Sequence, residues 1–220
     1  MVRPFGDAAL LIEVEGESAL QRAARVHGIA DWIADVCSAR DGWGRPVPGA
    51  ETVLVPFDPV EPGLVAAAAR IRDVLETMSP GEVEQLWPDQ PRIVEVPVRY
   101  GGEAGPDLDG VAASLGLPAD DVVLLHASRI YRVLFIGFMA GFAYCGTLAA
   151  ELALPRRASP RTRVDAGSIV IAGRMTSVMP VDAPSGWHVI GHTSLSVWDP
   201  RRDPPGRLRP GDAVRFVPEA

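Results

Sequence analysis

The sequence predicts an α+β protein with two domains, a small N-terminal α/β domain (residues 1–88) and a strand-rich C-terminal domain (residues 89–220). Two observations carry this prediction. Helix-period and strand-period segments alternate in the first part of the chain, whereas short β-branched and aromatic runs separated by glycine and proline fill the second part. A chain of 220 residues is long enough for each domain to bury a core.

Alternating strand and helix patterns define the N-terminal domain. Residues 8–14 and 51–57 are typical of strands, while residues 18–38 predict a helix with an apolar face, and an alanine-rich helix follows the second strand. Residues 92–98, "RIVEVPV", alternate as a half-exposed strand does, and we expect them to join this sheet. The proline-rich segment 87–91, "WPDQP", is the predicted boundary. The expected buried stripe of the first helix is Leu20, Ala23, Ala24, Ala30, Ile33 and Cys37.

Short helices and then short strands are expected in the C-terminal domain. Residues 108–115 and 119–127 predict two helices, with Asp107 as the N-cap of the first. Turn signals separate the strand-like runs that follow, which predicts a closed barrel or a sandwich. The six runs are residues 131–138, 167–173, 176–181, 187–193, 195–199 and 213–218.

Composition excludes several classes of function. The net charge of −7 argues against a nucleic-acid partner, since phosphate binding requires a basic face. All basic residues are arginine, so the chain lacks both a Schiff-base lysine and a P-loop lysine. Cys37 and Cys145 have neither disulfide-framework nor zinc-site spacing, and the N-terminus has no secretory pattern. We therefore expect a cytoplasmic protein without a metal.

The segment 133–150 contains no charged residue, and its Gly137 and Gly141 have the spacing of a helix-dimerising pair. A membrane span, a buried core and a glycine-rich loop around a ligand are the alternatives. Three glycines, a tyrosine and a threonine dilute its apolar character. A short apolar run of this kind is more often buried in a core, so we expect no membrane span.

A run of arginines is the strongest local anomaly in this acidic chain. Arg156, Arg157, Arg161 and Arg163 fall within the segment "PRRASPRTR". Guanidinium groups bind carboxylates and phosphates in bidentate fashion, so one interpretation is a site for an anionic substrate. The alternative is a solvated loop whose arginines pair with nearby acids.

Histidine and cysteine supply further candidates for chemistry. His126 ends a predicted helix, where it is either a proton-transfer group or a helix cap. Cys145 with His126 as its base is a weaker hypothesis, because a buried cysteine usually behaves as a small apolar residue. His188 and His192 have no acidic third ligand at metal spacing, so we assign them structural roles.

The motifs in their order resemble the allophanate hydrolase subunit 1 family over nearly the whole chain. They include "FGDAALLIEV", "PVRYGGEAGPDLDGVAASLGL", "LHASRIYRVLFIGFMAGFAY", "PRRASPRTRVDAGSIVIAG", "GWHVIGHT" and "LRPGDAVRFVP". The resemblance implies an N-terminal α/β domain followed by a cyclophilin-like β-barrel. It also implies that "GFMAGFAYCG" is a glycine-aromatic segment of the barrel domain, where glycines let a ligand or partner approach the backbone.

The resemblance further implies a subunit of an ATP-dependent 5-oxoprolinase, which opens the lactam of 5-oxo-L-proline to glutamate. Such a subunit is active only with a sister of the allophanate hydrolase subunit 2 type and a third subunit, and ATP binds in the assembled complex. One alternative within the family is half of a biotin-dependent carboxyltransferase acting on urea or allophanate-pathway amides, with carboxybiotin delivered from elsewhere. The other is a regulator that binds a sensor histidine kinase.

On the same resemblance, His126 and Tyr144 are candidates for proton transfer or orientation in a site for a small anionic amide. The expected substrate-binding residues are Arg156, Arg157, Arg161, Arg163, Gly137, Gly141 and Phe142. The chain departs from the family pattern at Ala140, Cys145 to Thr147, Asp165, Arg174, Met175 and Ser177. Arg174-Met175 replaces the usual Gly-Gln, so a site that relies on that glutamine works differently here.

Overall fold

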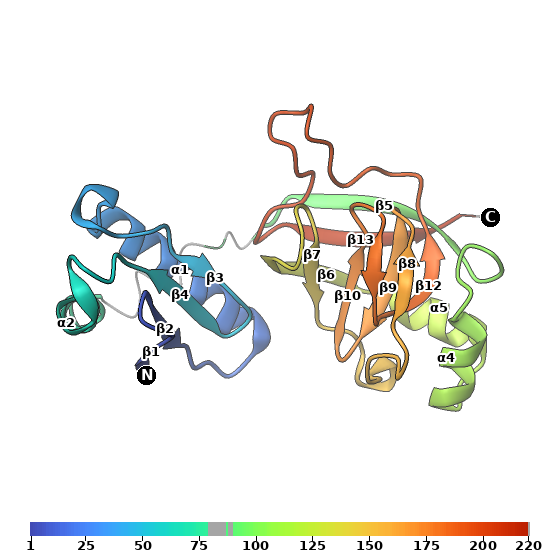
Figure 1. Ribbon diagram of the computed structural model, residues 1–220. Helices are drawn as coiled ribbons and strands as arrows, with labels where there is room; N and C mark the ends of the chain where they lie inside the picture. Colours follow the sequence, from blue (N-terminus) through green and yellow to red (C-terminus); the bar gives the residue numbers. More distant parts are fainter. Residues whose placement is uncertain (79–86, 88–89, 220) are drawn as a thin grey trace. The chain divides into compact units, whose positions relative to one another are not determined.

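The chain divides into two compact units, residues 1–89 and 90–220. Figure 1 shows the computed structural model, which describes residues 1–78, 87 and 90–219. The predicted boundary between residues 88 and 89 lies outside the described residues. An α+β fold with a closed barrel in the second unit confirms the predicted fold class.

The N-terminal unit is an antiparallel sheet with two helices packed on its buried face. Its elements are β1 (Val2–Pro4), β2 (Ala9–Glu13), α1 (Ala19–Val36), η1 (Ala39–Asp41), β3 (Val47–Pro48), β4 (Thr52–Pro56) and α2 (Gly63–Thr77). The strands lie in the order β1-β2-β4-β3. Leu10 and Ile12 point to the same face, because strand side chains alternate, and they share a core with Ile33 of α1 and Ile71 of α2.

The first helix begins where the sequence predicts it. The Ser18 side chain accepts a hydrogen bond from the backbone N–H of Gln21, which satisfies one of the free donors at the helix start. The expected buried stripe is confirmed except for Leu20, which is 40% exposed in the first turn. Burial of one helix face therefore fixes α1 on the sheet.

The C-terminal unit is a closed barrel in the strand order β10-β7-β6-β13-β5-β12-β9, in which β9 also pairs with β10. The barrel strands are β5 (Ile93–Tyr100), β6 (Ile130–Ile136), β7 (Ala143–Gly146), β9 (Ser168–Ala172), β10 (Met175–Val178), β12 (His188–His192) and β13 (Ala213–Pro218). β5 and β13 pair in parallel, and the other barrel pairs are antiparallel. The remaining elements are α4 (Leu108–Leu115), α5 (Ala119–Ala127), η2 (Ala150–Leu152), β8 (Arg161–Val164) and β11 (Ala183–Ser185).

Three expectations about this unit are corrected. The strand expected at residues 92–98 belongs to the barrel and pairs with β12 and β13, because an alternating pattern identifies a strand and not its partner. Residues 195–199 form a loop with one isolated bridge at Trp198. Asp107 occupies the N-cap position of α4 as expected, but its side chain forms no capping hydrogen bond, since its carboxylate is bound by two arginines described below.

The uncharged segment 133–150 consists of most of β6, a turn, β7 and part of η2. Among the residues that the structure describes, no helix has both the length and the apolar character needed to cross a bilayer. The segment instead supplies buried side chains such as Val133, Leu148 and Ala149 to the barrel core.

Candidate functional site

An aromatic pocket in the C-terminal unit brings together three of the predicted site residues, Phe142, Tyr144 and Arg156. Phe142 immediately precedes β7, Tyr144 is the second residue of β7, and Trp187 immediately precedes β12. Their ring centroids lie 4.8 Å (Phe142–Tyr144), 5.6 Å (Phe142–Trp187) and 5.7 Å (Tyr144–Trp187) apart, each pair edge to face. The pocket has a volume of about 200 Å³ and is lined by Phe138, Phe142, Tyr144, Arg156, Pro160, Pro184, Ser185, Gly186 and Trp187.

The floor of the aromatic pocket is a hydrophobic cluster separate from the barrel core. All five residues of β9 are buried because both faces of this strand are covered. Ile169 and Ile171 face the barrel core, while Val170 and Ala172 belong to the cluster that contains Phe142 and Trp187. The pocket is therefore built on a strand that is packed on both sides, which gives its aromatic walls a rigid support.

The turn between β6 and β7 forms the rim of the pocket and carries Phe138. Phe138 is 65% exposed and has a φ of 65°, a left-handed conformation that is rare for a residue with a bulky side chain. The turn is held by hydrogen bonds from Gly137 N to Phe142 O (3.1 Å) and from Phe142 N to Met139 O (3.1 Å). An exposed aromatic ring on a strained backbone is typical of a residue that serves a ligand site.

The two glycines of this turn differ in whether a side chain could replace their hydrogen atom, and this difference gives a first prediction. Gly141 has a φ of 80°, and a Cβ built there lies 2.5 Å from the Cβ of Trp198, whereas a Cβ at Gly137 meets nothing closer than 3.6 Å. We expect Gly141→Ala to lower the free energy of unfolding by about 2–4 kcal/mol, from backbone strain and overpacking together. Gly137→Ala is the matched control and should change it by less than about 1 kcal/mol. Equal effects of the two variants in chemical denaturation would contradict this account.

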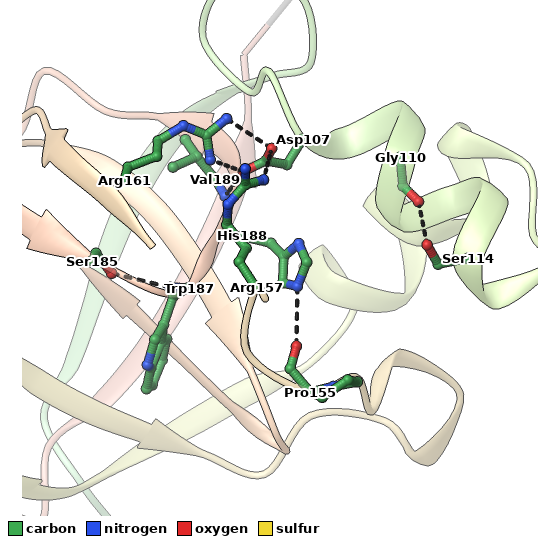
Figure 2. Close-up of polar contacts among 10 residues, drawn as sticks. All are labelled: Asp107, Gly110, Ser114, Pro155, Arg157, Arg161, Ser185, Trp187, His188 and Val189. Atoms are coloured by element: carbon green, nitrogen blue, oxygen red, sulfur yellow. Dashed lines mark hydrogen bonds and ion pairs between the residues drawn. The ribbon is translucent and has the colours of Figure 1, made fainter. Parts of the chain in front are cut away.

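Three of the four clustered arginines are engaged in ion pairs within the unit. Asp107, which is 8% exposed, accepts hydrogen bonds from Arg157 Nη1 (2.6 Å) and from Arg161 Nη1 (2.5 Å) and Nη2 (2.8 Å), as Figure 2 shows. It also accepts one from Val189 N (2.7 Å). Arg163 lies on the surface and pairs with two carboxylates, those of Asp165 and Asp182.

The ionisation of Asp107 follows from these contacts. Burial by itself would raise the pKa of its carboxyl. The hydrogen bonds from Arg161 and Val189, with the positive charges of Arg161 and Arg157, lower the pKa below its ordinary value. The ionised carboxylate of Asp107 therefore links three segments through its hydrogen bonds: the start of α4, the arginine segment and β12.

Arg156 is placed differently from its neighbours. It is exposed at the pocket, and no carboxylate pairs with it among the residues that the structure describes. The backbone on both sides of it is fixed: His188 Nε2 donates to Pro155 O (3.0 Å), drawn in Figure 2, and Arg157 N donates to Gly186 O (2.8 Å). The fold therefore presents one guanidinium without a carboxylate partner to the aromatic walls.

Tyr144 brings a neutral hydroxyl to the same pocket. Its side chain is half-buried, and its hydroxyl makes no hydrogen bond within the described part of the chain. Burial raises the pKa of Tyr144, while the positive charge of Arg156 acts in the opposite direction. At neutral pH the phenol is protonated and available as a hydrogen-bond donor beside a guanidinium.

His126 lies apart from the aromatic pocket, inside the barrel unit. It is fully buried, and its Nδ1 and Nε2 lie 2.8 Å from the Tyr100 hydroxyl and 2.9 Å from Thr176 Oγ1. Burial lowers the pKa of His126 to about 3. The imidazole is therefore neutral and hydrogen-bonded at both nitrogens, and it does not line the pocket that contains Tyr144. This geometry favours a structural role.

Cys145, Arg174 and Met175 do not line the pocket. The Cys145 thiol is buried, and burial raises its pKa to about 12, so it is a protonated core residue. Met175 packs, like Tyr144, against the cluster below the pocket. Arg174 donates from Nη2 to Leu148 O at 3.3 Å. The departure from the family's Gly-Gln pair thus places an apolar side chain next to the site.

Six of the lining residues are not among the predicted site residues, and two of the six, Phe138 and Trp187, are aromatic. Phe138 lies within the segment that was singled out for its glycines, and Trp187 lies within the quoted motif "GWHVIGHT". The motif drew attention to the segment that contains Trp187. Only the fold, however, places Trp187 beside Phe142 and Tyr144, which lie more than 40 positions earlier in the chain.

Comparison with known proteins identifies the family. Residues 1–208 match the model of the carboxyltransferase domain, subdomain C and D, and the chain belongs to this family. Two of its relatives are named as the B-type subunit of 5-oxoprolinase. The one from Escherichia coli O157:H7 is 42% identical over 98% of this chain and 94% of its own length, and the one from Bacillus subtilis is 35% identical over 98% and 91%. The family resemblance seen in the motifs is confirmed.

Solved structures share the fold. The protein TTHA0988 is 31% identical with a TM-score of 0.76 over 96% of this chain, which spans 39% of that longer protein. PH0987 from Pyrococcus horikoshii is 36% identical with a TM-score of 0.57 and is covered over 97% of its length. The urea amidolyase of K. lactis, at 19% identity and a TM-score of 0.75, is covered over 15% of its length and shares the fold alone.

Proposed function

We propose that this chain is the B-type subunit of a 5-oxoprolinase and acts only in the assembled enzyme. The observation that carries the proposal is the match, over nearly the full length of both partners, to two proteins that bear this name. The proposed reaction is the ATP-dependent opening of the lactam of 5-oxo-L-proline to glutamate.

The proposed chemistry divides between this chain and its sister subunits. ATP phosphorylates the lactam oxygen, water then attacks the ring carbon, the C–N bond breaks, and glutamate, ADP and phosphate leave. The chain has no lysine and no P-loop, so we assign nucleotide binding to the sister subunits. This chain contributes one wall of the substrate site, with a guanidinium and a neutral phenol as its polar groups.

Reconstitution tests the proposal. The chain is co-expressed with the sister subunit of the allophanate hydrolase subunit 2 type and the third subunit from the same source, and glutamate release is measured with and without ATP. We expect turnover only when all subunits and ATP are present. Turnover that persists without this chain, or an intact complex that does not turn over 5-oxo-L-proline, would exclude the proposal.

A further inference from the structure

We propose that the aromatic pocket binds a small cyclic carboxylate, with Arg156 pairing with the carboxylate and the rings of Phe142 and Trp187 packing against the ligand ring. The identity of the ligand, 5-oxo-L-proline, rests on the proposed function. The ligand class, an apolar ring with one negative charge, rests on the pocket itself.

The charge of the pocket selects a monoanion. Arg157 and Arg161 share the carboxylate of Asp107, which leaves one net positive charge, and Arg163 pairs with both Asp165 and Asp182, which leaves one net negative charge. These two groups cancel, and Arg156 is the charged residue among those that line the pocket in the described part of the chain. Phosphate sites usually combine several cations or backbone N–H groups. A single guanidinium next to a protonated phenol suits one carboxylate, which accepts a bidentate pair from the arginine and a further hydrogen bond from Tyr144.

The size and the walls of the pocket select a small ring. Drug-sized ligands occupy pockets of about 300–1,000 Å³, and this pocket, at about 200 Å³, suits a smaller molecule. Phe142 and Trp187 are 2% and 7% exposed, so their rings are held in place before a ligand arrives. The more exposed Phe138 stands at the rim, 5.6 Å from the ring of Phe142, where it can cover a bound ring.

The arginine is held in position by its chain neighbours. Pro155 and Arg157 have backbone groups that are hydrogen-bonded to the strand side of the pocket, and the Arg157 side chain is held by Asp107. A backbone that is fixed before binding reduces the entropy lost when the guanidinium is ordered by a ligand. His188 and Asp107 are positioning residues in this arrangement.

Binding to the full chain, without its sister subunits, tests the proposal. Three probes are titrated by two-dimensional NMR: 5-oxo-L-proline, 2-pyrrolidinone as the same ring without a carboxylate, and acetate as a carboxylate without the ring. We expect 5-oxo-L-proline to shift the Trp187 indole signal and to bind at least about 10-fold more tightly than either partial probe, because a charge-assisted bidentate pair and ring burial each contribute about that factor.

Substitutions locate the site. Arg156→Gln should weaken binding of 5-oxo-L-proline by about 10- to 100-fold. The matched control is Arg215→Gln, because Arg215 is a partly exposed arginine of β13 that pairs with Glu95 and does not line the pocket, and this variant should leave binding unchanged. Equal loss in both variants, or shifts that do not include Trp187, would overturn the proposal.

Turnover measurements on the assembled enzyme distinguish a failure of the pocket proposal from a failure of the proposed function. If the complex turns over 5-oxo-L-proline but Arg156→Gln leaves KM unchanged, the pocket proposal fails while the proposed function stands. Weaker subunit association in that variant would then mark the pocket as a protein contact. If the complex shows no turnover and the chain still binds the cyclic acid through Arg156, the proposed function fails while the pocket proposal stands.

Discussion

Replacing Asp107 with alanine is expected to lower the free energy of unfolding of the barrel unit by about 3–5 kcal/mol, the range found when one partner of a buried ion pair is removed. The change leaves the guanidinium groups of Arg157 and Arg161 without their carboxylate, and it leaves the N–H of Val189 without its acceptor. Because the carboxylate joins three segments, the loss should spread to the loop that carries Arg156.

Chemical denaturation measures the loss in the free energy of unfolding, and hydrogen exchange shows whether this loss occurs in the barrel unit. Since the chain has two compact units, the exchange rate of the buried Val133 amide, which donates to Asp212 O (2.8 Å) and does not contact Asp107, reports the barrel unit specifically. Asp109→Ala is the matched control, because Asp109 is an exposed acid in the first turn of the same helix. A loss below about 1 kcal/mol in the Asp107 variant would show that the ion pairs contribute little net stability.

Acid should destabilise the barrel unit through His126. The pKa of this residue is about 3 in the folded chain and about 6.5 when unfolded, so below pH 6.5 the unfolded state binds a proton that the folded state excludes. The stabilising contribution of the neutral His126 imidazole is therefore fully present above pH 6.5, and the free energy of unfolding falls by about 1.4 kcal/mol for each pH unit below that value. Between pH 6.5 and pH 5 the expected loss is about 2 kcal/mol.

The test compares the pH dependence of unfolding in the wild type and in His126→Gln. The variant has no titrating group at this position, so its free energy of unfolding should lie lower at pH 7.5 but vary less between pH 7 and pH 5. This range avoids Asp107, whose lowered pKa makes its stabilising contribution disappear only in stronger acid. Parallel pH profiles for the two proteins would show that folding does not lower the pKa of His126.

Local patterns predicted most of the helices and several of the barrel strands, because they depend on neighbours in the sequence. The short helices α4 and α5 match their predicted ranges, 108–115 and 119–127. Strand pairing depends on distant residues, which explains the error at residues 92–98: β5 pairs in parallel with β13, about 120 residues later. The short strand β7 was hidden by the glycines around it.

The candidate site shows the same limit. The sequence singled out four arginines, yet nothing in their spacing distinguishes Arg156 from Arg157. The distinction comes from Asp107, which lies about 50 residues earlier and appeared in the sequence as a helix cap. Its carboxylate binds the guanidinium groups because both partners are then charged and the contact with Arg161 is bidentate, which is more favourable than one hydrogen bond to a backbone N–H.

The position of β13 between β5 and β6 has a consequence for biosynthesis. Both neighbours leave the ribosome long before β13 is made, and each keeps one unpaired edge until this strand inserts between them. Unpaired strand edges are templates for association with other chains. The nascent barrel is therefore at its most aggregation-prone while residues 137–212 are being synthesised, and closure is a late, long-range event that links the two ends of the domain.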